Sequence, residues 1–401
     1  TAPNKGVEMD VFGQKAIIGA PGCGKTLVLA HRANFLRQKN NIANSGLHIF
    51  VYTNVLKNYI RAGLDLLDIP PECVTTFDSW CTDYYKKHIS KSLPKKDKYI
   101  DYDLIRKKVY NSLQSGSLKT KFDVVFVDEG QDLDENGIAI LSKIAHHVTI
   151  CMDHNQQLYD SRPPESIILS LLGLRKKNIA LLGAYRCSPY IVHMASRFIK
   201  DEFDQETFIN QSQTEIQGRL TPLFYMAQNF DDETERLIQI IRDRQMRDKR
   251  IGILLPFNKH VYAMAKDLQN AGINVEVQNK NPNTNNKLDF NTNNPKLMTY
   301  YSAKGLTFDS VLLPRLSRSF FNTRWWTSER IQRLLFVGIT RAKDWVYLSA
   351  LEDNPISELS ILDYSIEQGH LFVQDQEDLQ PETNEHSLVN EDFDEEDDYP
   401  F

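Results

Sequence analysis

Short apolar runs recur through the first 180 residues, and polar or amphipathic stretches separate them. The runs lie at residues 16–18, 48–53, 74–77 and 124–127, and a helical pattern begins at Leu27, soon after the first of them. Continuous apolar, β-branched runs of this length are typical of strands that are buried on both faces of a parallel sheet. The pattern predicts an α/β unit over residues 1–180, with a small Lys- and Tyr-rich helical insertion at about 82–121.

A second set of apolar segments begins near residue 179. Residues 251–255 form another strand-like run, and apolar residues at Val261, Met264 and Leu268 follow it at helical spacing. We therefore expect a second α/β unit over residues 181–365, with its own parallel sheet flanked by helices. Apolar content falls after about residue 366, which predicts an acidic disordered tail over residues 366–401.

The net charge of −6 hides an uneven distribution of charges. The 401 residues include 47 Lys and Arg and 53 Asp and Glu, but twelve of the acidic residues lie between Asp375 and Phe401, where there is no Lys or Arg. The rest of the chain carries 47 basic and 41 acidic residues. A mildly basic body with an acidic tail is compatible with a nucleic-acid-binding protein.

The cysteines and the hydropathy pattern narrow the class of protein. Five cysteines are scattered along the chain without C-x-x-C spacing, so they indicate neither a disulfide framework nor a zinc site. No apolar run approaches transmembrane length and no signal peptide is visible, so we expect no membrane partner. A reducing, cytoplasmic compartment is the default expectation.

A glycine-rich segment follows the first apolar run and precedes the first helical pattern. It fits G-x-x-x-x-G-K-[ST], a loop whose backbone N–H groups and following helix cradle phosphates. Lys25 is expected to neutralise charge on the β- and γ-phosphates, and the Thr26 hydroxyl to bind Mg²⁺. The predicted ATP-binding loop consists of Gly19, Ala20, Pro21, Gly22, Cys23, Gly24, Lys25 and Thr26.

Two carboxylates follow the apolar run at residues 124–127. Asp128 and Glu129 come at the end of a predicted strand, and open α/β sheets bind ligands at the carboxyl ends of their strands. We expect Asp128 to hold Mg²⁺, directly or through water, and Glu129 to orient or deprotonate the attacking water. Together with the phosphate loop, these residues predict a Mg²⁺-dependent nucleotide hydrolase.

The acidic pair is the beginning of a longer motif, Asp-Glu-x-Gln-Asp, that ends at Asp132. This motif resembles motif II of the UvrD/Rep family of superfamily 1 helicases. The resemblance implies two RecA-like (P-loop NTPase) domains with ATP bound between them. Segments that look like the other family motifs follow in the expected order, namely residues 51–54 (Ia), 76–80 (Ib), 153–159 (III), 185–186 (IV), 297–306 (V) and 333–342 (VI).

The resemblance assigns roles to residues of both predicted domains. Gln156 matches the glutamine that senses the γ-phosphate, Tyr185 matches the tyrosine that stacks on adenine, and Arg186 and Arg341 match arginines that reach the γ-phosphate. Gly305, in the segment similar to motif V, is also assigned to the nucleotide. The residues assigned to DNA are Tyr52, Thr53, Asn54, Trp80 and Ser302.

Several positions depart from the family pattern. Ser161 stands where the family has a base-stacking tryptophan, and Trp80, Trp325 and Trp326 are candidate replacements. Core packing is the commoner role for a tryptophan.

The nucleotide contacts depart as well. Thr307 replaces the glutamate that contacts the ribose, which puts that contact in doubt. No glutamine is well placed to read the adenine edge, because Gln14 lies too close to the phosphate loop. These departures predict relaxed nucleotide selectivity.

The acidic tail ends in Pro400-Phe401, which resembles the C-terminal tip of bacterial single-stranded DNA-binding protein. The resemblance implies a partner protein whose apolar pocket takes Phe401 and whose basic rim pairs with the acidic run. The alternative is a solvating acidic tail that ends in Phe by chance.

Three functions remain open from the sequence. The first is an ATP-dependent translocase or helicase on single-stranded or tailed duplex DNA, with 3′→5′ polarity implied by the resemblance. The second is a DNA-stimulated ATPase that acts as a regulatory or recruiting subunit without unwinding, which Ser161 and the small insertion favour. The third is an RNA helicase, because no reader of base edges or of the 2′-OH is identifiable.

Overall fold

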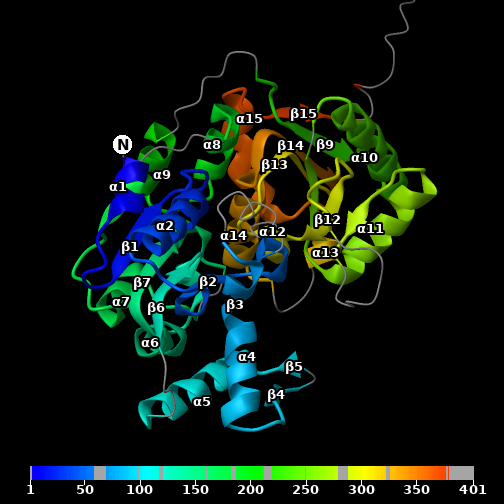
Figure 1. Ribbon diagram of the computed structural model, residues 1–401. Coiled ribbons are helices and arrows are strands. Elements are labelled where there is room, and N and C mark those ends of the chain that lie inside the picture. The colour runs from blue at the N-terminus through cyan, green and yellow to red at the C-terminus, as the bar shows by residue number, and fades with distance from the viewer. Residues whose placement is uncertain are drawn as a thin grey trace, which may run out of the picture.

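A computed structural model describes residues 2–57, 69–97, 99–116, 121–158, 161–181, 187–211, 219–248, 250–278, 288–321, 326–375 and 378. Two parallel sheets, each flanked by helices, make up the molecule (Figure 1). The predicted α/β class with two parallel sheets is confirmed.

The first sheet has six parallel strands in the order β3-β2-β6-β7-β1-β8. The apolar runs of the sequence form β1, β2 and β6 inside the sheet and β3 at its edge, and Ile17, Val125 and Phe126 are fully buried. The strands are β1 (Lys15–Gly19), β2 (Leu47–Val51), β3 (Val74–Thr76), β6 (Phe122–Val127), β7 (Ala145–Met152) and β8 (Ile179–Leu181), and the helices are α1 (Ala2–Glu8), α2 (Lys25–Lys39), α6 (Glu135–Ile144) and α7 (Glu165–Leu171).

The insertion in the first unit projects from the sheet as two helices and a short hairpin (Figure 1). Its elements are α4 (Phe77–His88), β4 (Lys95–Lys96), β5 (Tyr99–Ile100) and α5 (Tyr102–Gln114). Helix α4 begins directly after β3, because the Thr76 hydroxyl accepts a hydrogen bond from the Ser79 N–H at 3.2 Å. Buried Arg106 of α5 forms an ion pair with Asp78 of α4 within the insertion, and a second one, at 3.1 Å, with Asp134 at the start of α6.

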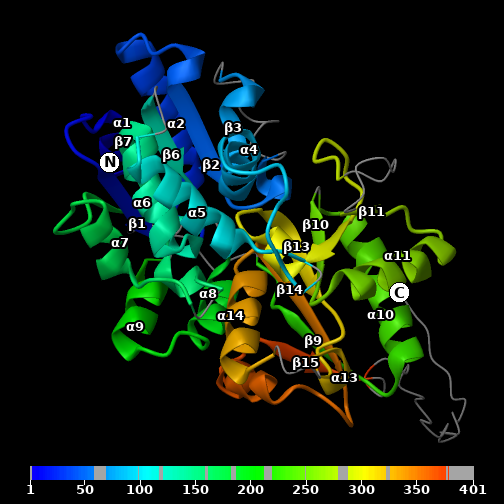
Figure 2. The same cartoon turned by 90° about the horizontal axis from the view of Figure 1, so that it is seen from below.

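The second sheet has seven parallel strands in the order β11-β12-β10-β13-β14-β9-β15. Its strands are β9 (Leu223–Ala227), β10 (Ile251–Leu255), β11 (Glu276–Val277), β12 (Lys296–Thr299), β13 (Phe308–Leu313), β14 (Ala342–Leu351) and β15 (Phe372–Gln374). Its helices are α8 (Pro189–Ser196), α9 (Glu202–Asn210), α10 (Phe230–Gln245), α11 (Asn258–Asn270), α12 (Tyr300–Ala303), α13 (Arg318–Phe321), α14 (Ser328–Ile339) and α15 (Asp363–Glu367). Figure 2 shows α14 beside the first unit, and it packs against α8 and the turn at His154–Gln156.

Two segments lie elsewhere than the sequence pattern suggests. The apolar run at residue 179, which we expected near the start of the second unit, forms β8 and pairs in parallel with β1 of the first sheet. Ordered structure also continues past residue 366, where we expected the tail to begin, because β15 pairs with β9 at the edge of the second sheet. Each segment adds a strand to the edge of a sheet. The strands that they pair with, β1 and β9, are distant from them in the sequence.

In the described part of the chain, no helix is both long and apolar enough to cross a membrane.

Candidate active site between the two sheets

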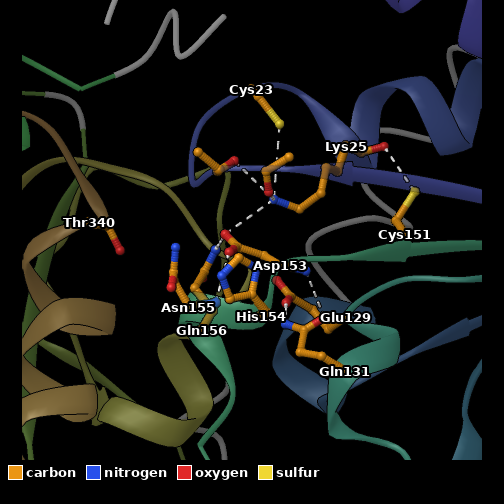
Figure 3. Close-up of polar contacts among 12 residues, drawn as sticks. Cys23, Lys25, Glu129, Gln131, Cys151, Asp153, His154, Asn155, Gln156 and Thr340 are labelled. Atoms are coloured by element: carbon orange, nitrogen blue, oxygen red, sulfur yellow. Dashed lines mark hydrogen bonds and ion pairs between the residues drawn. The ribbon is translucent and has the colours of Figure 1, made fainter. Parts of the chain in front are cut away.

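The phosphate loop lies at the carboxyl edge of the first sheet. It connects β1 to α2, and the neighbouring strands β7 and β6 end in Met152 and Val127 at the same edge. Gly22 and Gly24 have φ of 79° and 88°, in the left-handed region that glycine adopts without strain. The loop therefore opens toward the side chains that follow β6 and β7, as Figure 3 shows.

Lys25 folds back onto the loop that carries it. Its Nζ donates to the carbonyls of Gly19 at 2.7 Å and Ala20 at 3.0 Å, and lies 3.5 Å from Asp153 Oδ2 (Figure 3). Burial opposes the charge of the ammonium, but Cys23, Asp153 and the nearby carboxylates raise the pKa of Lys25 to about 12. Lys25 therefore provides a permanent positive charge at the loop, where phosphate groups would bind.

The structure brings the two predicted Mg²⁺ ligands together. The Thr26 hydroxyl donates to Asp128 Oδ2 at 2.7 Å, and Asp128 is buried. Burial and the neighbouring Glu129 raise the pKa of Asp128 to about 6. A cation would relieve this repulsion, so the donor set fits Mg²⁺. No cluster of three or more His, Cys, Asp or Glu side chains arranged to hold a metal occurs among the described residues. Mg²⁺ is commonly bound by one or two protein ligands together with substrate phosphates.

Glu129 lies where the two units meet, a region called the cleft below. Backbone and side-chain contacts hold it there. Its φ of 56° lies in the left-handed region, which costs a residue with a side chain about 1 kcal/mol or more. Gln131 Nε2 donates to Glu129 Oε2 at 2.6 Å, and Lys304 Nζ lies 3.7 Å from the same oxygen. Burial disfavours ionisation, yet Lys304 and then Lys25 lower the pKa of Glu129 below its ordinary value. The carboxylate is therefore ionised at neutral pH and can accept a proton.

Arg341, from the second unit, reaches into this cleft. It follows α14, and its guanidinium donates to Gln156 Oε1 at 2.5 Å and to the Val337 carbonyl at 3.0 Å. Gln156 Nε2 in turn donates to Asp153 Oδ2 at 2.5 Å (Figure 3). Arg341 and Lys25 are thus joined through Gln156 and Asp153, although they belong to different sheets.

The residues at the site that were not assigned from the sequence are Gln131 and Asp153, described above, and the buried pair Lys304 and Asp132. Lys304 Nζ donates to Asp132 Oδ2 and to the Gln156 carbonyl, both at 2.5 Å. Burial raises the pKa of Asp132 to about 6, and the adjacent Lys304 opposes that shift. The only signal in the sequence was their position inside the segments that resemble motifs V and II.

The residues assigned to DNA are partly occupied by local contacts. The Thr53 hydroxyl accepts from the Leu56 N–H at 3.0 Å, and Asn54 Oδ1 accepts from Lys57 Nζ at 2.8 Å. The Ser302 hydroxyl lies 2.9 Å from the Thr299 hydroxyl. Tyr52 is half-buried, and the centroid of its ring lies 5.4 Å from Lys304 Nζ.

The candidate stacking tryptophans pack against other aromatic rings. Trp80 stacks on Phe77 and Tyr84, with ring centroids 6.5 and 5.6 Å apart, and meets the edge of Phe50 at 6.0 Å. Its placement favours the packing role over a base-stacking role. Trp326 likewise lies 5.2 Å from Phe257 and 5.5 Å from Phe321, and Trp325 is outside the described residues.

Gly305, which was assigned to the nucleotide, and Gln14, which was rejected as a reader of adenine, both lie among the described residues. Gly305 has φ of 82° and packs against Leu56, where a Cβ would approach to 2.6 Å. Gln14 Oε1 accepts from the Val148 N–H at 2.5 Å, near the amino end of β7 and thus away from the phosphate loop. Tyr185, Arg186 and Pro400-Phe401 lie outside the described residues, so their roles stay sequence-based predictions.

The second unit matches a known family of domains. Residues 278–353, which include Lys304 and Arg341, match the model of the UvrD-like helicase C-terminal domain.

A relative and a solved structure are also similar to parts of the chain. The mitochondrial ATP-dependent DNA helicase HMI1 of Saccharomyces cerevisiae is 27% identical over 205 residues, which cover 45% of this chain and 29% of the yeast protein. The match thus spans less than a third of that relative. The C-terminal domain of a possible DNA helicase from Lactobacillus plantarum is 18% identical and covers 48% of this chain and 99% of that domain. Its TM-score of 0.35 is too low to support a conclusion about the fold.

Proposed function

We propose that this chain, whose second unit matches the UvrD-like helicase C-terminal domain, is an ATP-dependent translocase on single-stranded DNA that separates duplexes with 3′→5′ polarity. One observation carries the proposal: Arg341 of the second unit is hydrogen-bonded to Gln156 of the first, within the cluster that contains Lys25 and Glu129. Charged groups from both units therefore meet where phosphates would bind. Binding and hydrolysis of a nucleotide there are expected to open and close the cleft.

The residues of the cleft divide the chemistry of hydrolysis among them. Lys25 neutralises phosphate charge, and Glu129 accepts a proton from the attacking water. Mg²⁺ bound with ATP would neutralise the β- and γ-phosphates, with Thr26 and Asp128 as its protein ligands. Arg341 exchanges its bond to Gln156 for the γ-phosphate, which makes turnover depend on closure of the cleft. Cationic groups of this kind contribute roughly 10³–10⁵ in rate.

A second candidate is a DNA-stimulated ATPase that recruits or regulates other proteins and does not unwind DNA itself. Ser161 supports this reading, because it is exposed where the family has a stacking tryptophan and Trp80 is packed elsewhere. Loss of one stacked base costs about 1–3 kcal/mol of binding free energy. Such a protein would still hydrolyse ATP through the same residues.

Strand displacement separates the two candidates. The assay compares 3′-tailed, 5′-tailed and blunt DNA duplexes, with and without ATP, and the Lys25→Ala variant serves as the control without hydrolysis. We expect ATP-dependent displacement of the 3′-tailed substrate by the wild-type protein alone. DNA-stimulated ATPase activity without displacement of any substrate would favour the second candidate. A matched series with RNA strands tests the choice of nucleic acid.

A further inference from the structure

A short segment of the second unit contacts two parts of the first unit, namely the residues after β6 and β7 and the residues after β2. Residues 304–307 connect α12 to β13, and Lys304, Leu306 and the preceding Ala303 at the end of α12 are fully buried. Lys304 faces Asp132 and Gln156, which follow β6 and β7. Gly305 contacts Leu56, four residues after Tyr52. The segment therefore touches both the hydrolysis site and the stretch assigned to DNA.

Lys304 makes all of its described polar contacts with the first unit. Its Nζ contacts Asp132 Oδ2 and the Gln156 carbonyl at 2.5 Å and lies 3.7 Å from Glu129 Oε2, and its side chain is 0% exposed. Burying an ammonium costs several kcal/mol unless it is paired and hydrogen-bonded. This cost is offset only when the two units are docked, so the position of Lys304 reports how they are arranged.

The same ammonium also contacts an aromatic ring. It lies 5.4 Å from the ring centroid of Tyr52, within the range of a cation–π interaction. Tyr52 is half-buried, so the residue is partly open to solvent. A nucleic-acid base that stacks on the open part would hold the ring in one orientation, and with it the preferred position of the cation.

We propose that Lys304 is a positioning residue that couples occupancy of Tyr52 by a single-stranded nucleic acid to hydrolysis at Glu129. The inference rests on the proposed function and adds the connection between its two sites. Fixing the Tyr52 ring fixes the Lys304 ammonium, and Lys304 orients Asp132 and the Gln156 backbone. The Gln156 side chain then presents Arg341, while Glu129 keeps its charged neighbour. The connection consists of contiguous contacts, which are one physical route by which two sites are coupled.

A double-mutant cycle tests this connection. The variants are Lys304→Met, Tyr52→Leu and the double substitution, and the measurement is kcat for ATP with and without saturating single-stranded oligonucleotide. We expect each single substitution to lower the stimulation of kcat by at least fivefold while changing the KM for ATP less than twofold. The double variant should lose no more stimulation than the more affected single variant, because both substitutions break one connection. Independent, multiplicative losses would overturn the proposal.

Control variants separate coupling from structural damage. Tyr52→Phe keeps the ring and Lys200→Met removes an exposed lysine, so both should keep stimulation within twofold of wild type. Lys304→Arg keeps the charge and should recover part of the stimulation that Lys304→Met loses. If Lys304→Met does not fold, Asp132→Asn weakens the same contact from the other side and is expected to lower stimulation. Full stimulation in Asp132→Asn would then overturn the proposal.

The wild-type protein distinguishes failure of this inference from failure of the proposed function. Absence of stimulation by single strands in the wild type would overturn both. Normal stimulation in the wild type that persists in a folded Lys304→Met variant would overturn the coupling role alone.

Discussion

Two buried ionic clusters of this protein differ in how completely their charges are paired. In the second unit, Glu233 and Arg315 form a closed pair: Arg315 donates to Glu233 Oε2 at 2.6 Å, and Glu233 Oε1 accepts from the Arg315 N–H at 2.7 Å and the Ser349 hydroxyl at 2.6 Å. Arg315 also donates to the Thr234 hydroxyl at 2.7 Å and lies over the ring of Phe230. One negative charge meets one positive charge within a single unit.

The charged side chains of the cleft, called the cleft cluster, do not pair one to one in this way. Among its members, Asp132 Oδ1 is buried and makes no hydrogen bond to the described residues. Burial raises the pKa of Asp132, and burial together with the neighbouring Glu129 raises the pKa of Asp128. The comparison indicates that the carboxylates and cations of the cleft can bind a further cation and phosphate groups. The closed pair, in contrast, stabilises the fold. The cleft cluster consists of Asp128, Glu129, Asp132 and Asp153 with Lys25, Lys304 and Arg341.

Substitution of Arg341 should give the largest loss of ATPase activity. It should leave the closed pair of Glu233 and Arg315 unchanged. In Arg341→Ala we expect kcat in the presence of single-stranded DNA to fall roughly 10³-fold or more, because the γ-phosphate loses a cationic partner. DNA affinity, measured by fluorescence anisotropy, should change little. Arg242→Ala, at an exposed position of the second unit, is the matched control. Equal stimulation by DNA in Arg341→Ala and wild type would contradict the role of Arg341.

Glu129→Gln should have the next largest effect. The amide cannot take a proton from water, so kcat is expected to fall by about 10²–10⁴ while nucleotide binding is retained. The midpoint of thermal unfolding should fall slightly, because Lys304 and Lys25 favour the ionised carboxylate in the folded state and the amide loses that interaction. Glu135→Gln, an exposed residue at the start of α6, should behave as wild type. A wild-type kcat in Glu129→Gln would remove Glu129 from the chemistry.

The closed pair should respond to mutation in the opposite way. Arg315→Met leaves the Glu233 carboxylate buried without its cation, which should lower the free energy of unfolding by about 3–5 kcal/mol. The double variant Arg315→Met/Glu233→Gln should recover more than half of that loss, since no isolated charge remains. Urea unfolding measures both values, and kcat of the folded fraction should stay near that of wild type. A smaller stability loss in Arg315→Met than in Arg341→Ala would invalidate the contrast between the two clusters.

The smallest expected effect is on the pH dependence of stability and comes from His48. This residue is a buried titratable group with no ionic partner among the described residues. Its Nε2 lies 2.8 Å from the Thr75 hydroxyl, its ring packs against Phe50 and Phe122, and burial lowers the pKa of His48 to about 4. The unfolded chain, with an imidazole pKa near 6.5, therefore binds more protons between pH 6.5 and 4. The contribution of His48 to stability is present above pH 6.5 and is lost as the pH falls toward 4.

The His48→Gln variant isolates this contribution. Between pH 7.5 and pH 5 the wild-type protein should lose on the order of 1–2 kcal/mol more stability than the variant does. The comparison of the two proteins at both pH values cancels the titration of the cleft carboxylates, which both retain. Identical pH dependence in the two proteins would show that His48 titrates normally in the folded state.

The sequence by itself determined those parts of the molecule that depend on local chemistry. Buried β-branched runs became β1, β2 and β6, and glycine at position 24 allowed the left-handed turn that starts α2. The sequence also predicted that Thr26 and Asp128 would lie close together, because the carboxyl ends of parallel strands share one edge of a sheet. They form a hydrogen bond across 102 residues of the chain.

Only the tertiary structure decided which distant groups meet. Lys304 pairs with Asp132 across 172 residues, and Arg341 with Gln156 across 185. Strand order placed β8 in the first sheet and β15 in the second, and the packing of α4 turned Trp80 toward Phe77 and Tyr84. No local pattern specifies these contacts, because each depends on how two separately formed surfaces dock and on which buried charges must then be paired.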